Sequence, residues 1–265
     1  VEIMNYTFIS GATGGIGQAY AMTCAAKGYK LFLTGRSAQK LEALKHRVFG
    51  LYPMLEVEIF PCDLTDEKSR VRMYEYIDMK GLRFDRIVNV AGVDTQMAFQ
   101  DYTMEKLLFQ VRVNVESTLA NTLALLERRA AETEVITVAS MSGATPMPYF
   151  AVYSATKNCL VWFFSALRYE LKDKGVKVTT VMPGGVPTRP DIIEDIKGQG
   201  LWGKLSAKPA GYVAALSLKK AAKNKRLVIP GFFNKFLYYL MKIVPFGLKT
   251  KFIARRWSKL KKDAF

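Results

Sequence analysis

Ser10-Gly11-Ala12-Thr13-Gly14-Gly15-Ile16-Gly17 follows an apolar run at residues 6–9 and precedes a helical pattern over 19–27. Glycines at 11, 15 and 17 let the backbone turn tightly and approach a pyrophosphate, and the helix N-terminus supplies N–H donors. The spacing differs from the commoner Gly-x-Gly-x-x-Gly. Alone, such a loop is also compatible with a tight turn made for packing. The strand before it and the helix after it favour a nucleotide-binding loop.

Strand and helix patterns alternate along the rest of the chain. Short apolar runs, typical of buried parallel strands, occur at 6–9, 30–34, 56–60, 86–90, 135–139, 176–181 and 227–229. Helical patterns separate them at 19–27, 41–49, 66–79, 103–132, 154–174 and 209–222. The alternation predicts an α/β fold, a Rossmann-like, doubly wound parallel sheet of about seven strands with right-handed crossovers.

Composition excludes several kinds of site. One histidine, His46, and three dispersed cysteines leave no zinc site, Ser/His/Asp triad or disulfide framework, so we expect no metal and a reducing compartment. No signal-peptide pattern occurs and no apolar run reaches the roughly 18 residues of a membrane span, which predicts a cytoplasmic protein. Because the chain begins with Val1, two explanations stay open: Met4 is the native start, or a preceding segment was removed.

The end of the second predicted strand indicates which nucleotide binds. It reads Leu33-Thr34-Gly35-Arg36-Ser37, where a site for the cofactor without a 2′-phosphate usually has Asp or Glu. A guanidinium suits bidentate pairing with a 2′-phosphate. The alternative is that Arg36 is only a solvated loop charge. The sequence favours NADP(H), with Arg36 and Ser37 among its contacts and Gly11, Thr13, Gly15, Ile16 and Gly17 in the phosphate loop.

A tyrosine and a lysine suited to proton transfer open a later helix. In Tyr153-Ser154-Ala155-Thr156-Lys157 the two side chains are at i and i+4, on one helix face. A free phenol has a pKa of about 10. A neighbouring ammonium is expected to lower the pKa of Tyr153 and make it a usable general acid/base. Such pairs are common by chance, so the pair alone is weak support.

Three further features strengthen this interpretation. Ser140 closes the strand at 135–139, where its hydroxyl can bind a developing alkoxide. Asn114 lies among apolar neighbours in the middle of a predicted helix, where a buried amide needs a partner. Asn89-Val90-Ala91-Gly92 ends the fourth strand with a small, close-approach turn.

With these features in order, the chain resembles the short-chain dehydrogenase/reductase family from residue 5 to about 230. Ser10 replaces the usual threonine and Val90 a frequent second asparagine, and neither change threatens cofactor binding. The elements that carry the resemblance are Ser10 to Gly17, Asp63-Leu64, Asn89 to Gly92, Asn114, Ser140, Tyr153 with Lys157, and Pro183-Gly184-Gly185-Val186-Pro187-Thr188.

The resemblance implies a role for each matching position. Tyr153 exchanges the proton with the substrate oxygen, Lys157 holds the nicotinamide ribose and tunes Tyr153, and Ser140 positions the carbonyl. Asn114 is implied to hold a water of a proton relay. The remaining implied cofactor contacts are Asp63 and Leu64 around the adenine, Val186 and Thr188 at the carboxamide, and Asn89, Ala91, Gly92, Pro183 and Gly184.

Two apolar stretches point to the substrate. Met147-Pro148-Tyr149-Phe150 precedes Tyr153, and residues 191–208, with Trp202 and Leu205, stand where the family has a mobile lid. They favour an oxidoreductase acting on a hydrophobic ketone or alcohol such as a steroid or bile acid, although ordinary packing would explain them equally.

The alternatives are a 3-oxoacyl-thioester reductase of lipid metabolism and a non-catalytic NADP(H)-binding regulator. A sugar-nucleotide epimerase would need a larger C-terminal domain. We expect a homodimer or homotetramer.

The C-terminal region is distinct in charge. Residues 219–265 hold 14 Lys or Arg against one acid, a charge of +13, whereas residues 1–218 sum to +3. Phe232, Phe236, Leu240 and Ile243 recur at helical spacing, as do Ile253, Trp257 and Leu260. We therefore expect an NADP(H)-binding catalytic domain over 1–230 and basic amphipathic helices over 231–265. These helices could contact a membrane surface peripherally, cover the pocket or form a subunit interface; no nucleic-acid motif accompanies the charge.

Overall fold

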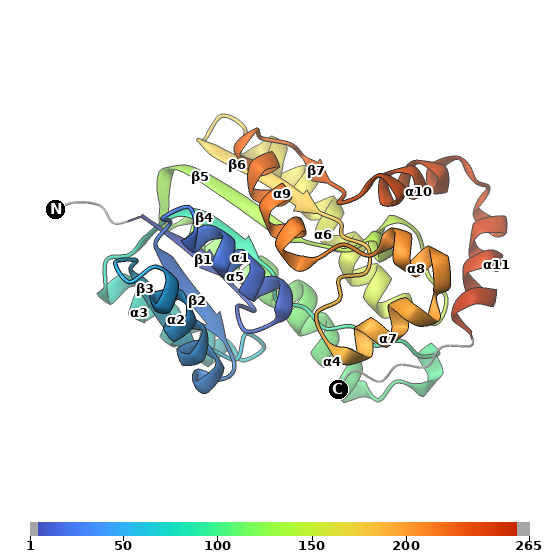
Figure 1. Cartoon of the computed structure of the whole chain (residues 1–265), viewed down its shortest axis with the longest axis horizontal. Helices are drawn as coiled ribbons and strands as arrows, with labels where there is room; N and C mark the ends of the chain where they lie inside the picture. Colours follow the sequence, from blue (N-terminus) through green and yellow to red (C-terminus); the bar gives the residue numbers. More distant parts are fainter. Residues whose placement is uncertain (1–4, 259–265) are drawn as a thin grey trace.

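A computed structural model describes residues 5–258, so Leu260 of the predicted tail pattern and Met4 lie outside the described residues. One parallel sheet organises the molecule, in the strand order β3-β2-β1-β4-β5-β6-β7 (Figure 1). The strands are β1 (Asn5–Ile9), β2 (Leu31–Gly35), β3 (Val57–Pro61), β4 (Arg83–Asn89), β5 (Arg129–Val138), β6 (Val176–Val181) and β7 (Leu227–Val228). The predicted doubly wound sheet is confirmed. Its order reverses between β1 and β4, which opens a crevice at their carboxyl ends.

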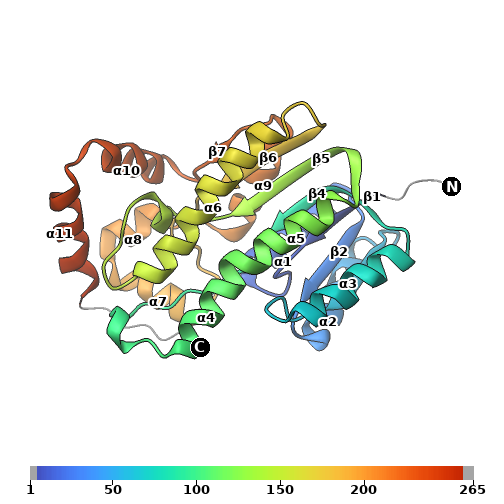
Figure 2. The same ribbon diagram turned by 180° about the vertical axis from the view of Figure 1, so that it is seen from behind.

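Helices cover both faces of the sheet (Figures 1 and 2). One apolar core lies under α1 (Gly15–Ala25), α2 (Ala38–Leu51) and α9 (Ala210–Ala222). The other lies under α3 (Glu67–Met79), α5 (Ser117–Leu126) and α6 (Ala151–Glu170). Strands buried on both faces need apolar side chains in both directions, which explains the continuous apolar runs of the sequence.

The long helix predicted over 103–132 is wrong at its end. The structure has α4 (Met104–Val111), a π-helical turn (Arg112–Glu116) and then α5, after which β5 begins at Arg129. Residues 127–132 are good helix formers, but β5 pairs with β4 from Phe84↔Arg129 and with β6 from Thr133↔Val176. These backbone hydrogen bonds, and an ion pair of 2.9 Å between Arg86 and Glu134, outweigh local propensity.

Four helices gather beyond the carboxyl ends of the strands. They are α7 (Pro190–Gly198), α8 (Gly200–Ser206), α10 (Phe232–Ile243) and α11 (Phe246–Trp257). Both views place α10 and α11 at the end of the molecule away from β2 and β3 (Figures 1 and 2). Trp202 of α8 joins them, with its ring 5.1 Å from that of Phe233 and 5.3 Å from the guanidinium of Arg256. Within residues 5–258, no helix is long and apolar enough to span a membrane.

Short helical turns complete the chain between these elements. Phe99–Asp101 and Met141–Ala144 form single 3-10 turns, the second directly after β5. Ser140 caps that second turn, because its Oγ accepts a hydrogen bond of 3.1 Å from the Ser142 backbone N–H. The cap fixes the side chain of Ser140 at the carboxyl end of the sheet.

Candidate active site

A cavity of about 590 Å³ opens where the glycine-rich loop faces α7, α8, α10 and α11. It receives side chains from the ends of β1, β2, β4, β5 and β6, from α6, and from α7, α8, α10 and α11. Of the predicted site residues, Ser37, Asn89 and Asn114 lie outside the cavity wall. Those that line it are Gly11, Thr13, Gly15, Ile16, Gly17, Arg36, Asp63, Leu64, Ala91, Gly92, Ser140, Tyr153, Lys157, Pro183, Gly184, Val186 and Thr188.

The glycine-rich loop has the close approaches that its sequence predicts. Gly11 adopts φ +62°, and a Cβ there would stand 2.8 Å from the Ala91 backbone. A Cβ on Gly17 would stand 2.1 Å from the Gly11 carbonyl oxygen. The Ser10 hydroxyl accepts hydrogen bonds from the backbone N–H groups of Val90 (3.1 Å) and Ala91 (3.3 Å), which ties the loop to the end of β4. This cradle, at the N-terminus of α1, fits a pyrophosphate.

The end of β2 presents Arg36 to the same cavity. Its guanidinium lies 5.6 Å from the centre of the Phe109 ring, a cation–π contact with α4. Ser37, the next residue, caps α2, since its hydroxyl accepts from the Lys40 backbone N–H at 3.3 Å. The carboxylate of Asp63 accepts from the Thr65 backbone N–H and hydroxyl. A fixed cation beside a helix N-terminus suits an anionic group on the adenosine side of a dinucleotide.

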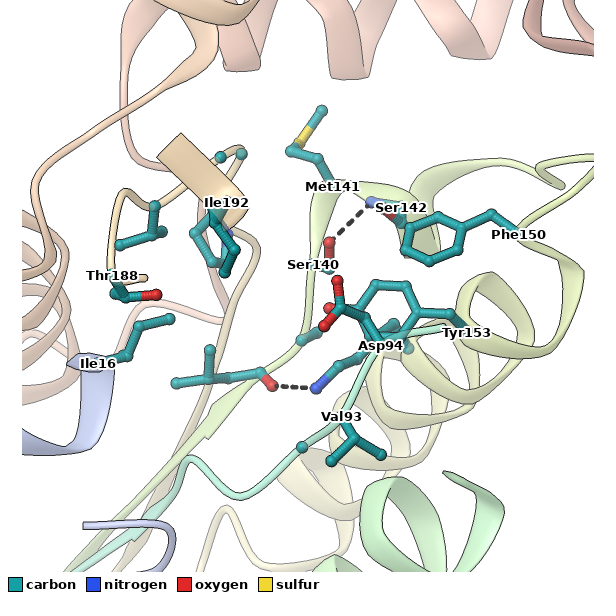
Figure 3. A pocket seen from close by; sticks show the side chains of 18 of the residues that line it. Ile16, Val93, Asp94, Ser140, Met141, Ser142, Phe150, Tyr153, Thr188 and Ile192 are labelled. Atoms are coloured by element: carbon teal, nitrogen blue, oxygen red, sulfur yellow. Dashed lines mark hydrogen bonds between the residues drawn. The ribbon is translucent and has the colours of Figure 1, made fainter. Parts of the chain in front are cut away.

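Ser140, Tyr153 and Lys157 converge at the centre of the cavity. The side chains of Ser140, just after β5, and of Tyr153 in α6 lie next to each other (Figure 3). One turn along α6 from Tyr153, the buried Lys157 donates a hydrogen bond of 3.0 Å from Nζ to the Val138 carbonyl oxygen. Phe150 stacks on Tyr153 with ring centres 4.5 Å apart, which holds the phenol in place.

The pKa of Tyr153 departs from the prediction. Burial raises it above that of a free phenol, the charge of Asp94 raises it further, and the Ser140 hydroxyl lowers it. The expected lowering by Lys157 is absent, since its Nζ lies 5.7 Å from the centre of the Tyr153 ring and bonds to the Val138 carbonyl oxygen. Burial lowers the pKa of Lys157 to about 8. At neutral pH Tyr153 is therefore protonated, the state needed for a proton donor.

Asn114 and Asn89 are held by protein groups. Asn114 lies in the π-helical turn, a distortion common at functional sites. Its amide accepts from the Val93 N–H (2.8 Å) and donates to the Val93 carbonyl (2.9 Å) and the Thr156 hydroxyl (3.0 Å). The buried amide thus finds the partners it needs, and its implied role in a water relay stays a prediction. The amide of Asn89 donates to the hydroxyls of Thr122 and Thr137, behind β4.

Comparison with known proteins agrees with this geometry. The family model described as short chain dehydrogenase matches residues 5–193. The chain belongs to the short-chain dehydrogenase/reductase family. Members of this family are oxidoreductases that use NAD or NADP, act on small molecules and typically form oligomers.

Relatives of this short-chain dehydrogenase align with about two thirds of its length. An uncharacterized oxidoreductase of Staphylococcus haemolyticus is 34% identical over 185 residues, which are 68% of this chain and 77% of that protein. A very-long-chain 3-oxoacyl-CoA reductase of Caenorhabditis briggsae is 27% identical over 191 residues, 70% of this chain and 60% of that protein. The chain therefore spans less than two thirds of the length of that second relative.

Solved structures show the same fold. One solved structure, from work on the stereoselectivity of 7β-hydroxysteroid dehydrogenase, has a TM-score of 0.82 at 24% identity. The match covers 94% of this chain and 96% of that chain. Levodione reductase has a TM-score of 0.74 at 21% identity, covering 86% and 96%. These structures share the fold of this short-chain dehydrogenase over most of its length.

Asp94 is a charged residue of the site that the sequence did not predict. Its carboxylate points toward Ser140 and Tyr153 (Figure 3) and lies 3.7 Å from the Arg189 guanidinium at the start of α7. Its charge raises the pKa of both Tyr153 and Lys157. A signal was present, because Asp94 stands two residues beyond Gly92, where the loop after β4 enters the crevice of this dehydrogenase.

Replacing Asp94 with asparagine is expected to shift the pH profiles of the dehydrogenase to lower pH. Without the carboxylate charge, the pKa values of Tyr153 and Lys157 both fall. Alcohol oxidation needs a deprotonated Tyr153 and therefore begins at a lower pH. Ketone reduction needs a protonated Tyr153, so as the pH is raised it declines at a lower pH than in the parent. The kcat/KM of each direction against pH measures this. Asp195→Asn, another carboxylate of the cavity wall, should leave the profiles in place; equal shifts in both variants would contradict the assignment.

Proposed function

We propose that this protein is an NADP(H)-dependent oxidoreductase that interconverts a ketone and a secondary alcohol on a hydrophobic substrate such as a steroid or bile acid. The observation that carries the proposal is the convergence of Ser140, Tyr153 and Lys157 on one cavity, next to a glycine cradle and Arg36. A regulator without catalysis would not need these three side chains together.

The residues present fit the dinucleotide along the whole cavity. The loop from Gly11 to Gly17 and the N-terminus of α1 would hold the pyrophosphate. Arg36 would pair with the 2′-phosphate. Asp63 and Leu64 would border the adenine, Val186 and Thr188 the carboxamide, and Lys157 the nicotinamide ribose. When bound, the nicotinamide supplies or accepts the hydride.

The protein's own side chains transfer the proton. In reduction, Tyr153 donates its Oη proton to the substrate oxygen as negative charge develops there. The Ser140 hydroxyl, oriented by its bond from the Ser142 N–H, donates a hydrogen bond to the same oxygen. Lys157 has a pKa of about 8, so it stays mostly cationic at neutral pH and favours the phenolate that forms.

The far side of the cavity fits a flat apolar substrate. Phe150 stacks between the rings of Tyr153 (4.5 Å) and Trp257 (5.6 Å). Met147 and Ile253 join them in one apolar cluster. The rigid rings of Phe150 and Trp257 beside the proton donor favour binding of a polycyclic ketone. A 3-oxoacyl thioester is the second candidate, supported by the similarity to a very-long-chain 3-oxoacyl-CoA reductase.

Turnover with a matched set of ketones tests the proposal. We expect NADPH oxidation with steroid and bile-acid ketones, at kcat/KM values well above those for acetone-sized ketones, since burying apolar rings contributes about 25 cal/mol per Å². A preference for 3-oxoacyl thioesters would select the second candidate. No NADPH oxidation with any carbonyl compound would contradict the proposed activity.

A homodimer is proposed as the assembled form. Exposed apolar side chains line one side of α5 and α6, with Leu123 exposed by 69%, Trp162 by 70% and Tyr169 by 73%. A face of this kind is suited to self-association about a two-fold axis. Light scattering on the parent and on Trp162→Glu measures it: the variant should be monomeric, and a monomeric parent would contradict the assignment.

A further inference from the structure

The outward face of α10 carries a row of large apolar side chains. Phe232, Phe236, Tyr239 and Ile243 recur along one side of the helix, exposed by 86%, 53%, 63% and 79%. Lys235 and Lys242 are exposed beside this row. An exposed apolar row of this size, bordered by cations, is typical of a surface that binds something.

The next helix continues the same character. Leu248 is exposed on α11, by 65%, and Phe246 is exposed at its start. Lys251 and Arg255 are exposed among them. We call the exposed apolar and basic side chains of α10 and α11 together the tail face. Both helices lie at one end of the molecule, where a broad flat partner can reach them (Figures 1 and 2).

The opposite faces of the same helices form part of the active-site cavity. Leu237 and Met241 of α10 line it, as do Ile253 and Trp257 of α11. Asn234 anchors α10 to the lid, because it accepts from the Ser206 hydroxyl (2.7 Å) and donates to the Ser206 carbonyl (2.8 Å). The two helices therefore separate the substrate cavity from the tail face by a single layer.

The charge of the tail face indicates its partner. Residues 232–257 contain six Lys or Arg and no Asp or Glu. A second copy of this chain would bring the same positive charge to the interface, which costs free energy. An anionic lipid surface complements both properties, since it attracts the lysines and accepts the aromatic and aliphatic side chains in its interfacial layer.

We propose that the tail face docks the protein onto an anionic lipid surface. The cavity then lies directly behind the docked helices, so that a hydrophobic substrate passes between the bilayer and the site. This passage of substrate rests on the proposed function. The docking depends only on the tail face.

Flotation of the full chain with lipid vesicles tests the docking. We expect binding to vesicles of phosphatidylglycerol and phosphatidylcholine in equal parts at low salt, much less at high salt, and little binding to phosphatidylcholine alone. Changing Lys235 and Lys242 to Gln should weaken binding roughly 30-fold, because each cation near an anionic surface contributes about fivefold. Changing Lys219 of α9 and Lys223, the residue directly after α9, to Gln alters net charge equally and should have a much smaller effect.

A second pair of variants tests the apolar row. Phe232→Ser, Phe236→Ser and Ile243→Ser combined should lower binding by at least about tenfold. The matched control combines Leu51→Ser, Met54→Ser and Met79→Ser, which are exposed apolar residues of α2, the loop after it and α3. Both triple variants should keep parental turnover of a ketone in solution, which shows that the fold and the cavity persist.

Three outcomes would overturn the docking. The parent could fail to bind anionic vesicles, or the α9 and α2/α3 controls could lose as much binding as the tail variants. Alternatively, the tail variants could change the oligomeric mass instead of vesicle binding, which would make the tail face a contact between copies. Vesicle binding without turnover of any ketone would contradict the proposed function and leave the docking intact.

Discussion

Replacing Tyr153 with phenylalanine is expected to lower turnover by about a thousandfold while leaving the Kd for NADPH nearly unchanged. The variant lacks only the Oη proton, and general acid catalysis contributes about 10²–10⁴-fold. The remaining ring keeps its stacking on Phe150, whose centre lies 4.5 Å away. Steady-state kcat and NADPH fluorescence titration measure the two quantities separately.

A nearby tyrosine supplies the control for this variant. Tyr149→Phe removes a phenol four residues earlier, outside the cavity wall, and should keep parental turnover. Residual activity of Tyr153→Phe within tenfold of the parent would mean that another group delivers the proton. A large loss of NADPH binding would mean that Oη serves the cofactor rather than the proton.

Replacing Arg36 with aspartate is expected to reverse the cofactor preference from NADPH to NADH. The guanidinium is the cation that the end of β2 presents to the cavity, and Phe109 holds it there. Each hydrogen bond to a charged group contributes about 1.5–3 kcal/mol, so losing a bidentate pair should lower NADPH affinity by about a hundredfold or more. The new carboxylate repels a 2′-phosphate and can accept from a ribose hydroxyl. The kcat/KM ratio for the two cofactors measures the reversal.

The control for Arg36 lies on the adjacent helix. Arg47→Asp changes charge by the same amount on the exposed side of α2, where Arg47 donates to Gln18 at 3.1 Å, and should leave the ratio unchanged. A parent that already prefers NADH would contradict the interpretation of β2. An equal fall for both variants would indicate that overall charge, not Arg36, sets the affinity for NADPH.

The secondary-structure predictions succeeded or failed according to whether local sequence or long-range pairing decides the element. The strand at 176–181 was predicted with its observed bounds, because a β-branched apolar run between turn residues has no competing pattern. The helix predicted over 103–132 was wrong at its end, residues 127–132, because pairing with β4 and β6 is a long-range interaction that local propensity does not contain. Element type thus followed from the sequence wherever periodicity and tertiary pairing agreed.

The sequence by itself determined the sheet, the glycine-rich loop and the i, i+4 spacing of Tyr153 and Lys157, since these depend on local backbone geometry. Only the tertiary structure decided the electrostatics of the site. Burial, which no pattern of neighbours along the chain measures, raises the pKa of Tyr153 and lowers that of Lys157 to about 8. Folding also brings Asp94 beside them and turns one face of α10 and α11 into the cavity while leaving the other exposed. These properties arise from segments distant in sequence that meet at the carboxyl ends of the strands.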